Sequence, residues 1–193
     1  MYNLNVHMQN GNSFHHMWHE RMASRGTREI FSCIYNFCRS LPPHITEFNG
    51  WCDNCSGQNK NTFSPKYGIA IVNDNTLSLN TMNIKFLEVG HTYMEADQDF
   101  GLIEREKKGK KIFVPAEWKM LIKGASKRFR VTMMDDSQFI NCDSLDGVLR
   151  TPKKDEDGNP IRWLQIRWMR FTRGSYSMLF KTTHNADAPF RRV

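Results

Sequence analysis

The stretch that decides the fold is WCDNCSGQNKN, which occupies residues 51–61. An apolar strand predicted over residues 46–52 leads into this stretch and ends at Asp53. A second predicted strand over residues 82–89 carries the later sequence FLEVGHT, residues 86–92. Because open α/β sheets bind ligands at the ends of their strands, this pattern predicts a site around Asp53.

The flanking segments alternate between strand and helix patterns. Apolar and polar side chains alternate over residues 2–7 and 14–18, and the turn between them predicts a hairpin. Thr27 sits where a helix N-cap is expected, and apolar residues then recur at helical spacing up to Cys38. The remaining helix patterns cover residues 61–72 and 94–108. This order requires a sheet with helices packed on it, so the predicted class is α/β.

The character of the chain changes after Val114. We expect a core of residues 1–114 and a small, basic α+β extension of residues 115–193. The elements predicted in the extension are a helix over residues 115–125 and strands over residues 129–134, 161–171 and 176–181.

Composition narrows the class of protein. The chain has 193 residues, of which 39% are hydrophobic and 24% charged, which is typical of a globular domain rather than a disordered chain. No apolar run is long enough to span a membrane. Met1 leads into YNLNVH without the pattern of a secretory signal, so we expect a nuclear or cytoplasmic protein. The net charge of +7 favours a polyanionic partner such as DNA.

Several carboxylates are candidates for a metal site. Asp53 follows one strand and Asp97 lies early on the helix after the next, so the two could meet at a sheet edge and hold Mg²⁺ or Mn²⁺. Glu29 could supply a third ligand, and Asp99 or Glu104 could replace Asp97. The alternative is structural, in which Asp97 and Asp99 cap a helix and Asp53 anchors a turn.

Specific motifs then point to a family. DNCSGQNKN (residues 53–61), FLEVGHTYMEAD (residues 86–97) and LIER (residues 102–105) resemble an uncharacterised family of eukaryotic, transposon-derived proteins. MWHE (residues 17–20) and SRGTREI (residues 24–30) also resemble that family, as does the late segment from Arg162 to Lys181. The family is regarded as transposase-like, with a ribonuclease-H-type fold.

The resemblance implies a mixed sheet flanked by helices and an ancestral two-metal cleavage or strand transfer of DNA. It implies that Asp53 is the acid after the fourth strand, that Asp97 lies on the last helix and that Glu29 is the first-helix glutamate. The chain starts at what resembles the second strand, so the first strand and its acid are expected to be missing. We therefore expect an inactive fragment, or one whose missing strand another chain supplies by self-association.

Other residues are candidates for contacts with nucleic acid. Asn59 and Lys60 lie in a turn near Asp53 and could hold a phosphate, and His91 could contact a phosphate or only shape its turn. Basic residues near aromatic side chains form the remaining candidates, although a solvated strand face has the same pattern. These residues are Lys107, Lys108, Lys110, Lys111, Arg167 and Arg170.

Two alternatives to a nuclease remain. A non-catalytic module that binds nucleic acid or protein would keep the fold for its surface alone. A zinc-dependent hydrolase has only Cys52, Cys55 and His91 in its support, and a structural zinc site usually needs two cysteine pairs.

Overall fold

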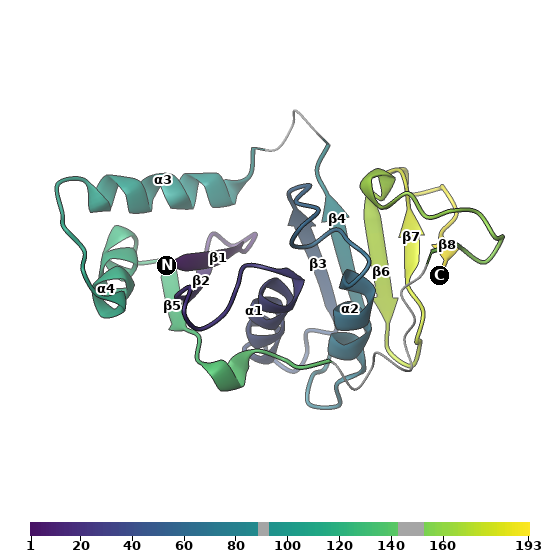
Figure 1. Ribbon diagram of the computed structural model, residues 1–193, viewed down its shortest axis with the longest axis horizontal. Helices are drawn as coiled ribbons and strands as arrows, with labels where there is room; N and C mark the ends of the chain where they lie inside the picture. The colour runs from purple at the N-terminus through teal and green to yellow at the C-terminus, as the bar shows by residue number, and fades with distance from the viewer. Residues whose placement is uncertain (89–92, 143–152) are drawn as a thin grey trace.

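The computed structural model describes residues 1–88, 93–142 and 153–193, which form two mixed β-sheets and four α-helices (Figure 1). The protein therefore has an α/β fold, as the sequence predicts. The sheets have the strand orders β1-β2-β5 and β3-β4-β6-β7-β8. None of the helices in the described ranges is long and apolar enough to cross a membrane.

The three-stranded sheet contains the predicted hairpin. Strands β1 (Tyr2–His7) and β2 (Ser13–Trp18) pair antiparallel, and β5 (Phe129–Met133) pairs parallel with β2. The turn needs Gly11, whose φ of 82° is strained for residues with a side chain.

The five-stranded sheet combines parallel and antiparallel pairs. Strands β3 (Glu47–Cys52) and β4 (Thr81–Phe86) are parallel, so their carboxyl ends lie at the same edge. The other three strands follow in antiparallel order after β4: they are β6 (Trp168–Thr172), β7 (Leu179–Lys181) and β8 (Arg191–Arg192).

Helix α1 (Thr27–Arg39) joins the two sheets, between which it lies in Figure 1. The Phe37 ring lies 5.1 Å from the ring of Phe14 on β2 and 6.2 Å from that of Phe48 on β3, measured between centroids. Both sheets therefore bury apolar side chains in one core under this helix.

Helix α2 (Ser64–Asn73) packs against the five-stranded sheet beside α1. It approaches β6 so closely that a Cβ on Gly68 would lie 2.5 Å from the ring of Phe171. The sheet face toward these helices is fully apolar at its centre. Its buried side chains are Met82, Ile84, Phe86, Met169, Phe171 and Phe180.

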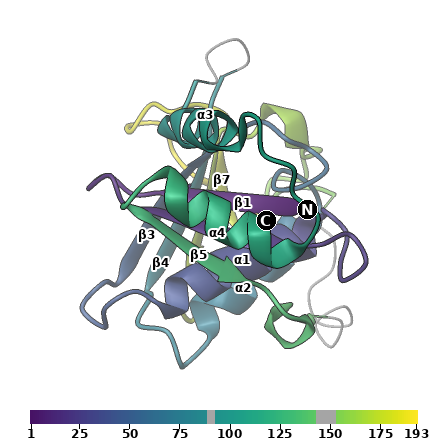
Figure 2. The same ribbon diagram turned by 90° about the vertical axis from the view of Figure 1, so that its left-hand side faces the viewer.

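Helices α3 (Glu95–Lys107) and α4 (Pro115–Ala125) pack on the other side of the three-stranded sheet, and Figure 2 shows α4 in front of β5. The apolar residues buried there form a smaller second cluster. They are Met17, Ile103, Leu121, Ile122 and Phe129.

The structure corrects two local predictions. Helix α1 is capped by Gly26 rather than Thr27, because the Glu29 carboxylate accepts the Gly26 N–H while Thr27 Oγ1 accepts a hydrogen bond from Asn61. The strand predicted over residues 161–171 begins only at Trp168. The carbonyl of Leu164 accepts a hydrogen bond from the Lys60 ammonium, and residues 163–165 form a 3₁₀ turn.

The segment after residue 114 completes both sheets. Strand β5 joins the hairpin, and β6 to β8 extend the sheet that β3 and β4 begin. The expected boundary between residues 1–114 and 115–193 stays a prediction, and strands from both sides of it pair with one another.

Candidate functional site

Asp53 lies directly after β3, at the edge where the parallel strands β3 and β4 both end. Its exposed carboxylate accepts a hydrogen bond of 3.2 Å from the amide of Asn59, which is buried. The neighbouring Asn54 amide donates to the carbonyl of Leu87, just past β4. The turn after β3 is thus fastened to the end of the adjacent strand.

Lys60 lies in this turn but points into the protein. It is 1% exposed, and its ammonium donates to Asn54 Oδ1 at 2.6 Å and to the Leu164 carbonyl at 2.8 Å. Burial, with a smaller effect from the Arg167 charge, lowers the pKa of Lys60 to about 8. In this structure Lys60 ties the turn to the segment before β6, and its expected role toward phosphate stays a prediction.

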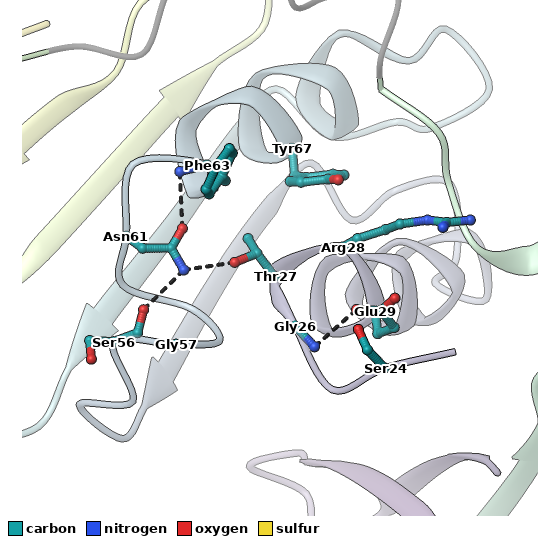
Figure 3. A pocket seen from close by; sticks show the side chains of 10 residues that line it. All are labelled: Ser24, Gly26, Thr27, Arg28, Glu29, Ser56, Gly57, Asn61, Phe63 and Tyr67. Carbon is teal, nitrogen blue, oxygen red and sulfur yellow. Dashed lines mark hydrogen bonds between the residues drawn. The ribbon is translucent and has the colours of Figure 1, made fainter. Parts of the chain in front are cut away.

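A cavity of about 600 Å³ separates this turn from the first turn of α1 (Figure 3). Ser56 and Asn61 line one side of it, while Thr27 and Glu29 line the other. The structure therefore brings Glu29 to the same cavity as the turn that begins at Asp53. The Glu29 carboxylate is 5% exposed and accepts the Gly26 N–H at 2.9 Å, so it serves as a helix cap here.

The acids of α3 lie elsewhere, because α3 packs on β1 and α4. Asp97 is exposed and caps the helix by accepting the Met94 N–H at 2.8 Å. Glu104 is exposed and lies 3.7 Å from Lys107. Within residues 1–88, 93–142 and 153–193, no three His, Cys, Asp or Glu side chains come together as a metal site would require.

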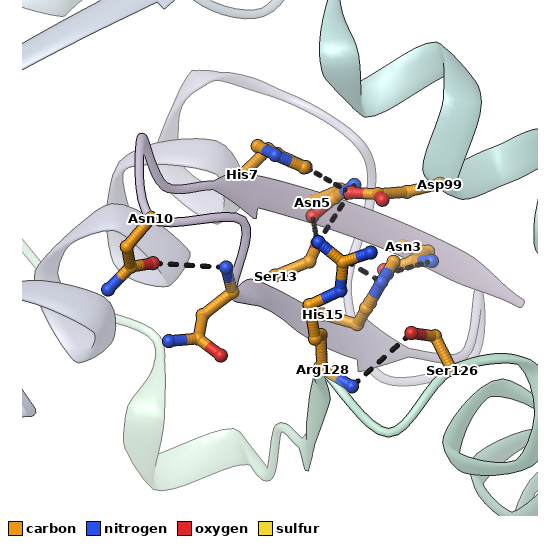
Figure 4. Close-up of polar contacts among 10 residues, drawn as sticks. Asn3, Asn5, His7, Asn10, Ser13, His15, Asp99, Ser126 and Arg128 are labelled. Carbon is orange, nitrogen blue, oxygen red and sulfur yellow. Dashed lines mark hydrogen bonds and ion pairs between the residues drawn. The ribbon is translucent and has the colours of Figure 1, made fainter.

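Asp99 instead docks α3 on the hairpin through a buried polar network (Figure 4). Its Oδ2 accepts hydrogen bonds from Asn5 and His7 at 2.8 Å and from the Ser13 hydroxyl at 2.7 Å. Burial by itself raises the pKa of Asp99, but these hydrogen bonds hold it below its ordinary value. The sequence gives no sign of this network, because alternating polar residues on a hairpin usually indicate a solvated face.

The expected basic cluster lies at the end of α3. Lys108, Lys110 and Lys111 follow α3 and are exposed, and Lys110 forms an ion pair with Glu106 in the last turn of that helix. The Lys107 ammonium lies 5.2 Å from the centroid of the Trp118 ring. The cluster is open to solvent, but carboxylates close by offset part of its charge.

The side of the five-stranded sheet facing away from α1 and α2 carries a row of alternating aromatic and basic residues. The strand register pairs Trp51 with Lys85, Lys85 with Trp168, and Trp168 with Lys181. Arg170 lies on the same side, opposite Asn83. We call this surface the outer face, and it consists of Trp51, Lys85, Trp168, Arg170 and Lys181.

Three cations of the outer face gather around Trp168. The charged groups of Lys85, Arg170 and Lys181 lie 4.2, 5.1 and 5.0 Å from the centroid of its ring. Lys85 also lies 5.3 Å from the ring of Trp51, so its ammonium sits between two indoles. Such contacts orient cations without neutralising them.

These cations have no described carboxylate as a partner. Arg170 donates to Asn83 Oδ1 at 2.9 Å, and Lys181 donates to the backbone carbonyls of Asn185 and Ala186. Lys85 makes no hydrogen bond with any residue that the structure describes. Lys181 is only 4% exposed, so Lys85 and Arg170 supply the accessible positive charge of the outer face, next to Trp51, which is 51% exposed. Glu47 is exposed on the same side of the sheet and accepts a hydrogen bond from Asn83, so one carboxylate lies at the margin of this face.

The sequence pattern predicts the outer face only in part. Arg170 was a predicted candidate and lies on this face. Arg167, the other candidate in this segment, is half-buried just before β6, and its guanidinium donates a hydrogen bond of 3.0 Å to the Leu164 carbonyl. Trp51, Lys85 and Lys181 were missed because they lie on three other strands. The period of two along each strand could have placed them on one face of their own strands, but it does not give the strand order that brings them together. His91 lies outside the described residues.

The fold and the outer face define a mixed α/β protein with a basic, aromatic sheet surface. The chain belongs to the family described as a domain of unknown function, DUF7869, which matches residues 7–153. No curated protein and no solved structure matches the chain. The family match includes the turn after β3, Trp51 and Lys85.

Proposed function

We propose that the protein is a non-catalytic module that binds nucleic acid on the outer face. The observation that carries the proposal is the row Trp51, Lys85, Trp168, Lys181, in which aromatic rings alternate with cations across four strands. Proteins that hold a polynucleotide backbone combine these two kinds of side chain.

The charge distribution supports a polyanion as the ligand. The chain carries a net charge of +7, and no described carboxylate pairs with Lys85, Arg170 or Lys181. A phosphate that approaches this face gains Coulomb energy and releases condensed counterions. An acidic polypeptide offers the charge but lacks the planar bases that suit an exposed tryptophan.

The positions of the acids favour binding over catalysis. Glu29 and Asp97 both accept backbone N–H groups as helix caps, and Asp53 accepts an amide from Asn59. Asp97 belongs to a helix that packs on the other sheet. In this arrangement the three carboxylates serve local structure.

The test measures affinity for a labelled oligonucleotide as a function of salt concentration. We expect binding that weakens as salt rises, and we expect Lys85→Ala to reduce the slope of log affinity against log salt by about 0.7–0.9, the value for one phosphate contact. Lys123→Ala is the matched control, because Lys123 is an exposed lysine on α4. Salt-independent binding, or equal effects of both variants, would contradict the proposal.

A second candidate is an ancestral, transposase-like nuclease with a ribonuclease-H-type fold. It is favoured by the parallel pair β3 and β4 with Asp53 at its carboxyl edge, and by the cavity that this turn shares with Glu29. It predicts Mg²⁺- or Mn²⁺-dependent cleavage of DNA that Asp53→Asn abolishes. We expect no cleavage by this chain, so reproducible cleavage lost in Asp53→Asn would replace the first proposal with this one.

A further inference from the structure

We infer that the outer face binds unpaired nucleotides, with a base stacked on Trp51 and the adjoining phosphate held by Lys85. The inference rests on the proposed function and adds the class of nucleic acid. It depends on the different surroundings of the two tryptophans, on the Lys85 ammonium between them and on the edge position of Trp51.

The Trp51 side chain offers an exposed ring on which a base can stack. It lies on β3, the edge strand of its sheet, and half of its surface is exposed. The His184 ring supports it at a centroid distance of 5.0 Å, and His184 Nε2 is held 2.9 Å from the carbonyl of Phe86. A large aromatic ring that is supported from within and open to solvent suits a stacked base.

Trp168 has a different role because other side chains surround its ring. Its indole N–H donates to Asn83 at 2.8 Å, and the Phe190 ring contacts it edge-on at 5.2 Å. Lys85, Arg170 and Lys181 occupy further positions around the ring. Trp168 is therefore a positioning residue that orients cations, and Trp51 is the ring that a base can reach.

Lys85 lies where the phosphate of such a nucleotide would fall. It is the register partner of Trp51 on the neighbouring strand, which is about 4.8 Å away in a β-sheet. Among the residues that the structure describes, its ammonium contacts the two indole rings and no hydrogen-bond acceptor, which leaves its N–H groups for phosphate oxygens. Arg170, on the next strand, extends the positive charge in the direction of a second phosphate.

This geometry separates single strands from duplexes. In a duplex the bases are paired and stacked on each other, so Trp51 can reach no base face and only the phosphate contacts remain. An unpaired strand offers both contacts. Stacking of one base on an aromatic ring corresponds to about a 5- to 150-fold gain in affinity.

The experiment compares the full chain with variants on a labelled oligothymidine, on oligouridine and on a DNA duplex of the same length. We expect Trp51→Ala to weaken single-strand binding by about 5- to 150-fold with an unchanged salt slope and unchanged duplex affinity. Trp51→Phe should retain most of the affinity because it keeps an aromatic face. Tyr176→Ala, which removes a side chain that is 69% exposed elsewhere, is the matched control.

The outcomes distinguish this inference from the proposed function. Salt-dependent binding that Trp51→Ala does not change, or changes equally for the duplex, overturns the inference and leaves the proposed function standing. Absence of binding to every polynucleotide overturns both, as does full competition by polyglutamate at equal charge. Binding to either oligothymidine or oligouridine with the expected loss in Trp51→Ala, and retention in Trp51→Phe, supports it.

Discussion

Mild acid is expected to destabilise the protein through two histidines on β2. His15 and His16 point to opposite sides of the three-stranded sheet, and both are buried, with 0% and 4% of their surfaces exposed. Burial lowers the pKa of each imidazole from 6.5 to about 4. The Asp99 carboxylate raises the pKa of His15 somewhat, but burial outweighs it.

The sign of the effect follows from proton binding. Between pH 6.5 and pH 4 the unfolded chain binds protons at these histidines and the folded chain does not. The free energy of unfolding therefore has its full value above pH 6.5 and falls as the pH drops toward 4. At pH 5 the loss is roughly 2 kcal/mol for each histidine, or roughly 4 kcal/mol for the pair.

The assay is urea unfolding at pH 7 and pH 5, followed by tryptophan fluorescence. We expect the free energy of unfolding to fall by roughly 4 kcal/mol in the native chain and by about half as much in His16→Gln. His44→Gln is the control, because His44 is an exposed histidine before β3. A native loss below about 1 kcal/mol, or a His44→Gln result that matches His16→Gln, would refute the reasoning.

Two further predictions concern packing and the polar network. Gly68→Ala should lower the free energy of unfolding by about 1–3 kcal/mol, because the new Cβ would lie 2.5 Å from the buried ring of Phe171; a thermal melt with unchanged midpoint would contradict this. Asp99→Asn should cost about 2 kcal/mol at pH 7, because the carboxylate accepts three hydrogen bonds and its lowered pKa keeps it charged there. That cost should shrink as the pH falls through the range where the native carboxylate is protonated, and urea unfolding across that range would measure it.

Most elements could be predicted from the sequence because their patterns are local. The alternation before and after Gly11 predicts the hairpin, and the apolar spacing up to Cys38 predicts α1. These signals depend on neighbours in the chain, which a sequence records directly. The predicted start of β6 was wrong because it depends on a contact between distant parts of the chain. The buried Lys60 donates a hydrogen bond to the Leu164 carbonyl, and the strand begins only after this segment.

The site was harder to predict because it depends on strand register. Trp51, Lys85, Trp168 and Lys181 adjoin only when four strands pair in one register, and no local pattern reports that pairing. Asp99 shows the same limit, since its position on α3 gives no sign that three hairpin side chains bind its carboxylate. The metal-binding roles expected for Asp53, Asp97 and Glu29 remain predictions.

The family match covers only part of the outer face. Trp51 and Lys85 lie within residues 7–153, whereas Trp168, Arg170 and Lys181 follow them in the chain. Trp51, the platform that we propose for a base, therefore belongs to the region that the family model covers, and two of the three cations of the outer face follow that region. If the outer face binds nucleic acid as we propose, substitutions after residue 153 would change its affinity and salt sensitivity without altering the proposed stacking residue.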